Sequence, residues 1–461
     1  MKKHYFLLSA FFFFSMTICA EQKSLLQLQQ EFVNLRFGMF IHFNIPTFMD
    51  DDWADPDASP AIFNPKKLDC NQWAKTAKEA NMTYGCLTTK HHSGFCIWDT
   101  KTTDYNVMNS PFKRDVVKEY ADAFRKHGLK VMLYYSILDT HHRLRPGYIV
   151  PEHTEMVKAQ LTELLTNYGE ITALVIDGWD APWSRISYDE IPFEEIYHLV
   201  KSLQPNCLLM DLNAAKYPSQ ALFYTDIKSY EQGAGQHIPK SNMLPALSCL
   251  PINSHWFWKK DFPTSPVKDP EKMVNENIIP FNKVFCNFIL NAAPNRDGLI
   301  DDNAVEAFRK IGKLWKNEGP LPPLSEHAAP IISSNIAKFK PTNSSWSWDM
   351  HIMDLANDDN FSTGWSSNSS VKKPWLEIDL GNEQPFNMIT VTEKYDRNDI
   401  RAYKLEYMQN GKWKTILSKK KQDFIEVCRF ERVQGSKVRI VIEGFDVAPT
   451  IAEFGVYNEK R

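Results

Sequence analysis

An acidic residue closes an apolar run in the stretch VIDGW, where Asp177 follows Val175 and Ile176 and is followed at once by Gly178. Burying an unpaired carboxylate is costly, so Asp177 lies either at a solvated strand end or among partners that a function requires. A purely structural alternative is a turn, because Asp-Gly pairs often open one. The residues at the ends of the other apolar runs decide between these interpretations.

Histidines and tyrosines stand at the ends of the other early apolar runs. Such side chains can hydrogen-bond both a carboxylate and the hydroxyl groups of a polyol. Taken singly, a strand-end histidine is often structural, and adjacent tyrosines often point to opposite faces of a strand. Their coincidence at one end of successive runs favours a site around Asp177. They are His42 after the first run, Lys90, His91 and His92 after the second, and Tyr134 and Tyr135 after the third.

The composition narrows the class of ligand. The 461 residues carry a net charge of only -3, so no global field favours nucleic acid or a membrane surface. With 13% aromatic residues, the chain is suited to a neutral ligand such as carbohydrate. The three histidines lack the compact spacing and the carboxylate company of common metal-ligand sets, so we expect no metal and no other cofactor.

The elements that must position these side chains alternate along the chain. Helix-like segments at 70–81, 114–128 and 151–169 separate the early apolar runs. This alternation predicts parallel strands, and seven or eight units over some 300 residues favour a (β/α)8 TIM-like barrel, whose active face lies at the carboxyl ends of the strands. The apolar runs are 37–44, 82–90, 130–137, 173–179, 207–213, 221–230 and 284–294, with a missing eighth strand expected near 248–253.

The N-terminus has the layout of a secretory signal. A basic start, an apolar run and small residues ending at Ala20 predict a cleaved signal peptide at 1–20 and a secreted or periplasmic protein. A lipoprotein attached through Cys19 is the alternative, although Ile18 is bulky for such a site. Seven cysteines remain after cleavage, an odd number without a Cys-x-x-Cys pair, so we expect buried core thiols.

Several motifs together resemble the catalytic domain of the family 29 glycoside hydrolases, the retaining α-L-fucosidases. The resemblance runs in order over roughly 25–318, and the most specific element joins His-His-x-Gly-Phe to Asp-Tyr-Asn and Lys-Arg-Asp. It implies that Asp177 is the nucleophile and that His42, His91, His92 and Tyr134 or Tyr135 contact the sugar. The motifs are RFGMFIHFN, TTKHHSGFCIWDT, DYNVMNSPFKRDVVKEYADAFRKHGLKVMLYYS, VIDG and FILNAAPNRDG.

The resemblance also requires a second carboxyl group. A retaining glycosidase uses one ionised carboxylate at the anomeric carbon and one protonated carboxyl that donates to the leaving oxygen. Hydrogen bonds are expected to keep the pKa of the first low, and an apolar setting to raise that of the second. We assign the acid to Glu231 in SYEQGAGQ, with Asp226 and Asp211 as the competing candidates.

L-Fucose carries a methyl group, so its pocket needs an apolar wall. Trp256 in SHWFWKK resembles the Trp of the family's Trp-Gly-Tyr element, while Trp53, after Asp52, stands in place of a Glu-Trp pair. Phe40 could complete the wall. Val175 replaces a frequent aromatic residue and PALSC replaces the common Trp-Glu-x-Cys, so linkage and sugar preference stay open.

A proline-rich linker at 319–330 separates the barrel, 21–318, from a different kind of domain at 331–461. Alternating apolar and polar residues between turn signals predict an antiparallel β-sandwich of jelly-roll type. The turn Asp-Asp-Asn-x-x-Thr-x-Trp followed by Trp-Leu-Glu-Ile-Asp-Leu-Gly resembles the discoidin, or coagulation-factor type C, domain. Relatives often bind glycans or hold a structural calcium; the alternative is a domain that only packs against the barrel.

Two classes of function are compatible with these features of the sequence. The first is a secreted retaining exo-α-L-fucosidase that acts on a fucosylated oligosaccharide or glycoconjugate, with no nucleic-acid partner and no membrane span. The second is a carbohydrate-binding protein built on an inactive barrel. A related exo-glycosidase, such as an α-L-galactosidase, is a further alternative.

Overall fold

The computed structural model describes residues 22–325, 329–394, 397–421 and 423–460. The predicted signal peptide, residues 1–20, and Cys19 within it lie outside the described residues. Within the described ranges, no helix combines the length and apolar character needed to cross a membrane. The seven cysteines that follow residue 21 are all buried and free, as expected for core thiols.

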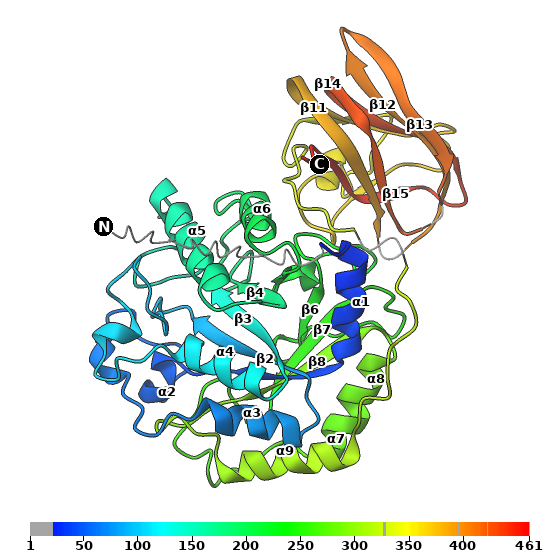
Figure 1. Cartoon of the computed structure of the whole chain (residues 1–461). Coiled ribbons are helices and arrows are strands. Elements are labelled where there is room, and N and C mark those ends of the chain that lie inside the picture. The colour runs from blue at the N-terminus through cyan, green and yellow to red at the C-terminus, as the bar shows by residue number, and fades with distance from the viewer. Residues whose placement is uncertain (1–21, 326–328, 395–396, 422, 461) are drawn as a thin grey trace, which may run out of the picture.

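Eight parallel strands form the first domain, in the order β5-β4-β3-β2-β1-β8-β7-β6 (Figure 1). The predicted (β/α)8-type barrel is therefore confirmed, with one opening, because no ladder joins β5 to β6 in the described part of the chain. The expected strand near 248–253 is β7. The bounds are β1 (Phe37–Ile41), β2 (Tyr84–Lys90), β3 (Lys130–Ser136), β4 (Ala173–Asp177), β5 (Leu208–Asp211), β6 (Lys228–Glu231), β7 (Ala246–Pro251) and β8 (Cys286–Ala292).

Helices on the outside of the barrel connect the early strands. Aspartates cap two of them: Asp69 accepts a hydrogen bond from Asn71 N, and Asp115 accepts one from Lys118 N. Each side-chain oxygen satisfies a backbone donor that the first turn leaves unpaired, which fixes where the helix begins. The helices are α3 (Cys70–Glu79), α4 (Val116–Lys126), α5 (Pro151–Thr166), α6 (Phe193–Leu203) and, after β8, α9 (Asp302–Leu314).

Shorter helical segments fill the remaining connections. Between β5 and β6 the described chain contains only the 3-10 turn η3 (Ala214–Lys216), and between β6 and β7 only η4 (Gln232–Ala234). The connection from β7 to β8 contains α7 (Pro270–Lys272), a π-helical turn η5 (Met273–Ile278) and α8 (Ile279–Asn282). The helix α2 (Ile45–Met49) follows β1. The outer layer of helices is therefore incomplete beside β5, β6 and β7.

The predicted run 221–230 is a strand only at its end. Tyr224 has a positive φ of 53°, which interrupts an extended chain, and Phe223 forms a parallel bridge with Ile331. The segment before β6 therefore pairs with the start of the second domain instead of with the barrel. An apolar run cannot by itself indicate which backbone it pairs with.

Alternating residues of the strands fill the interior of the barrel, where Phe40, Tyr134 and Val175 belong to one buried cluster. The helix α1 (Leu25–Leu35) contributes Phe32 and Val33 to the same cluster. Phe32 packs against Tyr84, the first residue of β2, and its backbone oxygen accepts from Asn287 at the start of β8, so α1 covers the amino-terminal end of the strands. The opposite, carboxyl end is left for loops and for a site.

The second domain is an antiparallel β-sandwich, as predicted. Its strands follow the order β10-β15-β11-β14-β12-β13, and β9 pairs with β11. Bulges interrupt the long ladder of β11 with β14 and let these strands bend around a core that includes Trp365 and Tyr403. The strands are β9 (Thr342–Ser344), β10 (Trp365–Ser366), β11 (Trp375–Glu393), β12 (Ile400–Gln409), β13 (Lys412–Lys420), β14 (Ile425–Phe445) and β15 (Thr450–Tyr457), with the 3-10 turn η6 (Met353–Ala356) between β9 and β10.

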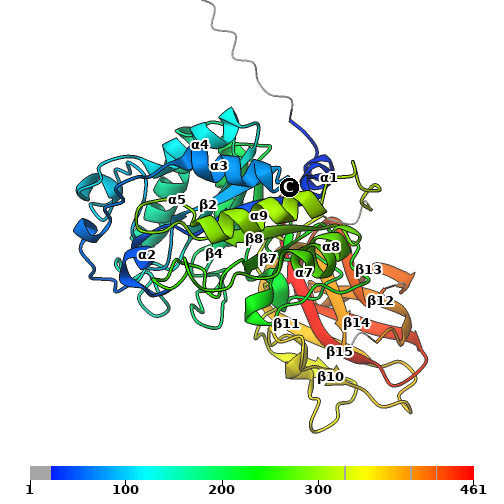
Figure 2. The ribbon, with the colours of Figure 1, turned by 90° about the horizontal axis from the view of Figure 1, so that it is seen from below.

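The sandwich packs against the side of the barrel where the outer helices are missing (Figure 1 and Figure 2). Phe361 lies with its ring centroid 5.7 Å from that of Tyr217 and 5.9 Å from that of Phe223. Lys216 contacts Asp180 of the barrel and lies 3.7 Å from Asp359 of the sandwich. The second domain thus completes the outer layer of the first.

Candidate active site

A cavity of about 280 Å³ opens at the carboxyl ends of the barrel strands. The side chains predicted from the sequence to surround Asp177 line it, as does Glu231, except Lys90 and Tyr135. The lining residues are Phe40, His42, Asp52, Trp53, His91, His92, Tyr134, Asp177, Trp183, Leu212, Glu231, Gly233, Ala234, Trp256 and Phe257.

Asp177 is the last residue of β4 and is almost completely buried. Tyr134 Oη donates to its Oδ2 at 2.6 Å, and Asn213 Nδ2 donates to its Oδ1 at 2.9 Å. Burial raises the pKa of Asp177, and the hydrogen bonds from Tyr134, Asn213 and the Gly178 backbone oppose that rise. The expectation of a lowered pKa is therefore wrong in direction, because desolvation outweighs the donors.

The backbone conformation after Asp177 explains why a glycine occupies the next position. Gly178 has φ 107°, and a Cβ atom there would lie 3.0 Å from both Ile137 Cγ1 and Leu138 N. The chain leaves β4 through a conformation that other residues rarely adopt. The Asp-Gly pair therefore does make a sharp exit, and this exit holds the Asp177 carboxylate at the mouth of the barrel.

Glu231 is the last residue of β6 and lines the same cavity. Burial, with the negative charge of Asp177 as the second cause, raises the pKa of Glu231 to about 7, against a hydrogen bond with Trp256. A carboxyl group with this pKa is protonated in a large fraction of molecules near neutrality. The pocket therefore contains one carboxyl suited to donate a proton and a second that is held by several hydrogen bonds.

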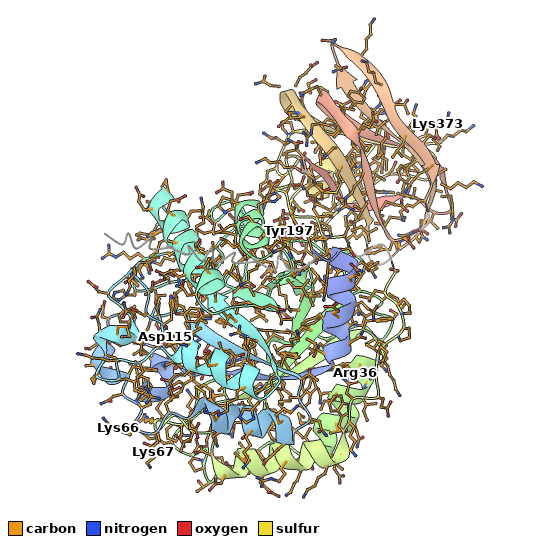
Figure 3. All side chains as sticks on the ribbon, viewed as in Figure 1. Arg36, Lys66, Lys67, Asp115, Tyr197 and Lys373 are labelled. Carbon is orange, nitrogen blue, oxygen red and sulfur yellow. The ribbon has the colours of Figure 1, made fainter. Side chains whose placement is uncertain are left out.

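The two competing candidates for the acid lie outside the cavity. Asp226 precedes β6, and Lys201 Nζ donates to it at 2.7 Å. Tyr197, which Figure 3 labels on α6, donates to it through Oη at 3.0 Å. Asp211 ends β5 and is fully buried, and burial raises its pKa to about 8. Its Oδ1 accepts from Asn213 N at 2.9 Å, so Asp211 holds the backbone of the residue whose side-chain amide donates to Asp177.

The three histidines of the pocket are buried, and burial lowers the pKa of each: that of His42 to about 4, that of His92 to about 3 and that of His91 well below its usual range. All three are neutral near pH 7. His92 Nε2 lies 3.8 Å from Asp177 Oδ2, and because the imidazole is uncharged this contact is not an ion pair.

Neighbouring groups fix the tautomers of two of these histidines. Asn291 donates its amide to Trp256 O at 2.7 Å, so its Oδ1 accepts from His42 Nδ1 at 2.7 Å. Ser136 donates to Leu138 O, so its Oγ accepts from His92 Nδ1 at 2.8 Å. In both rings Nε2 is left without a proton, as an acceptor for a ligand hydroxyl.

The adjacent tyrosines point to opposite faces of β3. Tyr134 faces the pocket, whereas Tyr135 Oη contacts Lys90 Nζ at 3.0 Å and donates to Gln160 Oε1 at 2.7 Å, on the side of helix α5. Lys90 also pairs with buried Asp139 at 3.2 Å. Tyr135 and Lys90 therefore lie outside the site, because the side chains of a strand alternate between its faces.

Aromatic side chains form the walls of the cavity. Phe40 lies 6.0 Å from Trp256 between ring centroids, in an edge-on arrangement at the bottom of the pocket. At the rim, Trp53 stacks on His92 at 4.8 Å and meets Trp183 at 5.5 Å. Trp53 and Trp183 are 49% and 41% exposed, so they present apolar surface to a ligand that extends out of the cavity.

Several residues of this site were not predicted from the sequence, among them Asn213, Asp52, Trp183 and Phe257. Asn213 follows β5 at the position where the same strand-end rule could have found it. Asp52 lines the cavity and is held by His255 at 3.0 Å and Lys259 at 3.1 Å; these contacts keep its pKa below the usual value despite burial. Trp183 and Phe257 come from long loops, and no periodic signal marked them.

A barrel with two inequivalent carboxyl groups, neutral histidines and an aromatic wall has the chemistry of a glycoside hydrolase. Within the described residues, no cluster of three or more His, Cys, Asp or Glu side chains is arranged to hold a metal ion. Comparison with known proteins agrees with that class. Residues 53–320 match the family described as Alpha-L-fucosidase, and residues 339–454 match the F5/8 type C domain.

The chain belongs to the α-L-fucosidase family, glycoside hydrolase family 29, and carries a C-terminal discoidin-like domain. It is 28% identical over 458 residues to Alpha-L-fucosidase 1 of Arabidopsis thaliana, covering 92% of this chain and 85% of that protein. It is 26% identical over 340 residues to human plasma alpha-L-fucosidase, covering 64% and 68%. Alpha-L-fucosidase isoenzyme 1 from Paenibacillus thiaminolyticus shares the fold, with TM-score 0.56, 23% identity and 92% and 100% coverage.

Proposed function

We propose that the protein is a retaining exo-α-L-fucosidase that releases terminal α-L-fucose from glycans. The observation that carries this proposal is the pair of carboxyl groups in one pocket. Asp177 is held by Tyr134 and Asn213, and Glu231 has a pKa raised to about 7. A double displacement needs this division between a nucleophile and a proton donor.

In the first step, Asp177 attacks the anomeric carbon and the bond to the leaving oxygen breaks. Glu231 gives its proton to that oxygen, so the leaving group departs as a neutral alcohol. In the second step, Glu231, now ionised, takes a proton from water, and the water oxygen displaces Asp177 from the anomeric carbon. Two inversions give net retention of configuration.

The remaining pocket residues offer the polar and apolar contacts that a 6-deoxy sugar needs. The unprotonated Nε2 atoms of His42 and His92 accept hydrogen bonds from ring hydroxyls, and Asp52 offers a further ionised acceptor. Phe40 and Trp256 supply the apolar wall for the methyl group. A hydroxyl on that carbon would have to be buried against these rings, which disfavours α-L-galactosides.

The test compares aryl α-L-fucoside with aryl α-L-galactoside, using purified protein that lacks residues 1–20. We expect the fucoside to be hydrolysed with at least tenfold higher kcat/KM, and Asp177→Ala to lose this activity without unfolding. A preference for the galactoside would replace the proposed sugar. Binding of fucose without hydrolysis of either substrate would instead identify a carbohydrate-binding protein.

We also propose that the protein is exported to the periplasm or the medium. The basic, apolar and small-residue segments of residues 1–20 support this proposal. Expression of the full chain in its host, followed by cell fractionation and N-terminal sequencing, tests it. A mature N-terminus near Glu21 is expected, and full-length protein retained in the cytoplasm would contradict export.

A further inference from the structure

A second pocket adjoins the first on the other side of Trp53. It has a volume of about 400 Å³ and shares Trp53, His91 and His92 with the first cavity. The loops after β1, β2 and β3 form its remaining walls. The residues of these loops that line the second pocket are Ala54, Pro56, Asp57, Ser93, Thr140, His141, Arg143 and Arg145.

Basic side chains gather on one wall of this second pocket. Arg143 and Arg145 are exposed, and within the described residues neither forms an ion pair. Arg145 lies over the ring of Tyr148, 4.6 Å from its centroid, which orients the guanidinium without neutralising it. Asp57 is the single acidic residue among those lining the pocket, so the lining includes two arginines and one carboxylate.

The charge of the second pocket is opposite to that of the first. Asp52, Asp177 and Glu231 line the first cavity, so an anionic group is repelled from it. Guanidinium groups bind carboxylate and sulfate oxygens through paired hydrogen bonds. The charges of the two pockets therefore favour one orientation of a substrate, with its neutral sugar in the first pocket and an acidic group in the second.

The loop that presents the arginines is firmly anchored. Asp139, fully buried, pairs with Lys90 at 3.2 Å and accepts from His142 N at 2.9 Å. Asp139 and Leu144 exchange two backbone hydrogen bonds, at 3.2 and 2.8 Å. These contacts close the turn 139–144 around a buried ion pair, so the turn is fixed before a ligand arrives.

The same loop is tied directly to the first pocket. Thr140 N and Oγ1 both donate to the backbone oxygen of His92, at 2.9 and 3.1 Å. Arg143 has a positive φ of 59°, a conformation that a non-glycine residue keeps only when its surroundings hold it. The backbone that carries Arg143 is therefore fixed relative to the sugar pocket.

We propose that the second pocket binds an acidic sugar of the leaving group, one that carries a carboxylate or a sulfate. This inference rests on the proposed fucosidase function and specifies its substrate class. The fucosyl unit occupies the first cavity, the next sugar lies against Trp53 at the rim, and its anionic group contacts Arg143 and Arg145.

The test uses three fucosylated oligosaccharides with one common core: a neutral one, one with a carboxylated sugar and one with a sulfated sugar. We expect kcat/KM for at least one acidic substrate to exceed that for the neutral substrate about tenfold at low salt. Arg143→Gln combined with Arg145→Gln should reduce this ratio to near one, mainly through KM. The advantage should also shrink as salt rises.

Lys66→Gln combined with Lys75→Gln serves as the matched control, because it removes two exposed positive charges at positions that line neither pocket (Figure 3 labels Lys66). It should leave the ratio unchanged. Equal rates on neutral and acidic substrates, or a ratio that the arginine substitutions do not alter, would overturn this inference and leave the fucosidase function intact. Hydrolysis of none of the three, nor of the aryl fucoside, would instead overturn the proposed function itself.

Discussion

Glu231 shares the pocket of Asp177, and the charge of Asp177 adds to burial in raising the pKa of Glu231 to about 7. The same burial acts on Asp177, where Tyr134 and Asn213 counter it with hydrogen bonds to the carboxylate. Unequal hydrogen bonding therefore separates two carboxyl groups that sit in one cavity. Each carboxyl group lies at the end of a barrel strand, Asp177 on β4 and Glu231 on β6. The neighbours of each group determine whether it acts as nucleophile or as acid.

Replacing Glu231 by Gln should affect substrates according to their leaving groups. An activated aryl fucoside needs little protonation, so its kcat/KM should fall far less than that of an oligosaccharide. In the wild-type enzyme the rate should decline above about pH 7, because the acid must be protonated, and in Glu231→Gln this basic limb should flatten. Equal losses on both substrates and an unchanged pH profile would assign Glu231 to sugar positioning alone.

Removing one donor from Asp177 should shift the acidic limb of the profile. Tyr134→Phe deletes the 2.6 Å hydrogen bond to the carboxylate, so the pKa of Asp177 should rise further and more molecules should be protonated at low pH. We expect the acidic limb of kcat/KM to move to higher pH and the rate to fall roughly tenfold or more.

The neighbouring tyrosine provides the control for that measurement. Tyr135→Phe removes a hydroxyl at the next position, on the face of β3 that contacts Lys90 and Gln160. It should lower stability while leaving the acidic limb of folded enzyme in place. A shift of the same size in both variants would refute a specific role for Tyr134.

The covalent role of Asp177 can be tested by chemical rescue. Asp177→Gly should lose activity by several orders of magnitude, because no carboxylate remains to form the intermediate. Azide should then restore turnover of an activated aryl fucoside and yield fucosyl azide of inverted configuration. Near-normal activity of the variant without azide would rule Asp177 out as the nucleophile.

The buried pair of Lys90 and Asp139 should matter for stability. Lys90→Met leaves a buried carboxylate without its cation, so the free energy of unfolding should fall by about 3–5 kcal/mol. Lys118→Met, at an exposed pair with Asp122, should change it little. Chemical denaturation of both variants checks this, and equal midpoints would contradict it.

The pH dependence of that stability has a defined sign. Lys90 and His142 hold the pKa of Asp139 below its usual range, so folding stability is greater where the carboxylate is ionised. This contribution is fully present above the unfolded-state pKa, about 4, and is lost as pH falls through the lower folded-state value. Asp139→Asn should therefore reduce the difference in stability between neutral and acidic pH.

The sequence predicted the barrel and most of the pocket for one physical reason. Parallel strands end at a common edge, so residues that close apolar runs, such as His42 and Asp177, meet there. The same rule cannot say which of two adjacent tyrosines faces inward, since that depends on the register of the strand. For the same reason it did not predict that Lys90 points outward, to Asp139. The sequence does not show whether burial or hydrogen bonding has the larger effect on the pKa of a carboxyl group. The expectation that the pKa of Asp177 is lowered was wrong for that reason.

The pocket residues that lie on loops, and the contacts between the two domains, could not be predicted from patterns in the sequence. Asp52 enters the pocket because His255 and Lys259 hold it from a distant loop. The segment before β6 pairs with Ile331 because the sandwich replaces the missing outer helices. Neither arrangement leaves a periodic signal, since each depends on the chain meeting itself across more than a hundred residues.

The most direct test of the account is the configuration of the sugar that wild-type enzyme first releases from an aryl α-L-fucoside, followed by proton NMR before mutarotation. Asp177 as nucleophile and Glu231 as acid and base predict α-L-fucose as the first product, with the β anomer appearing only later. Initial release of β-L-fucose would show a single displacement, and no release of fucose would show that the chain is not a fucosidase; either result would contradict the account.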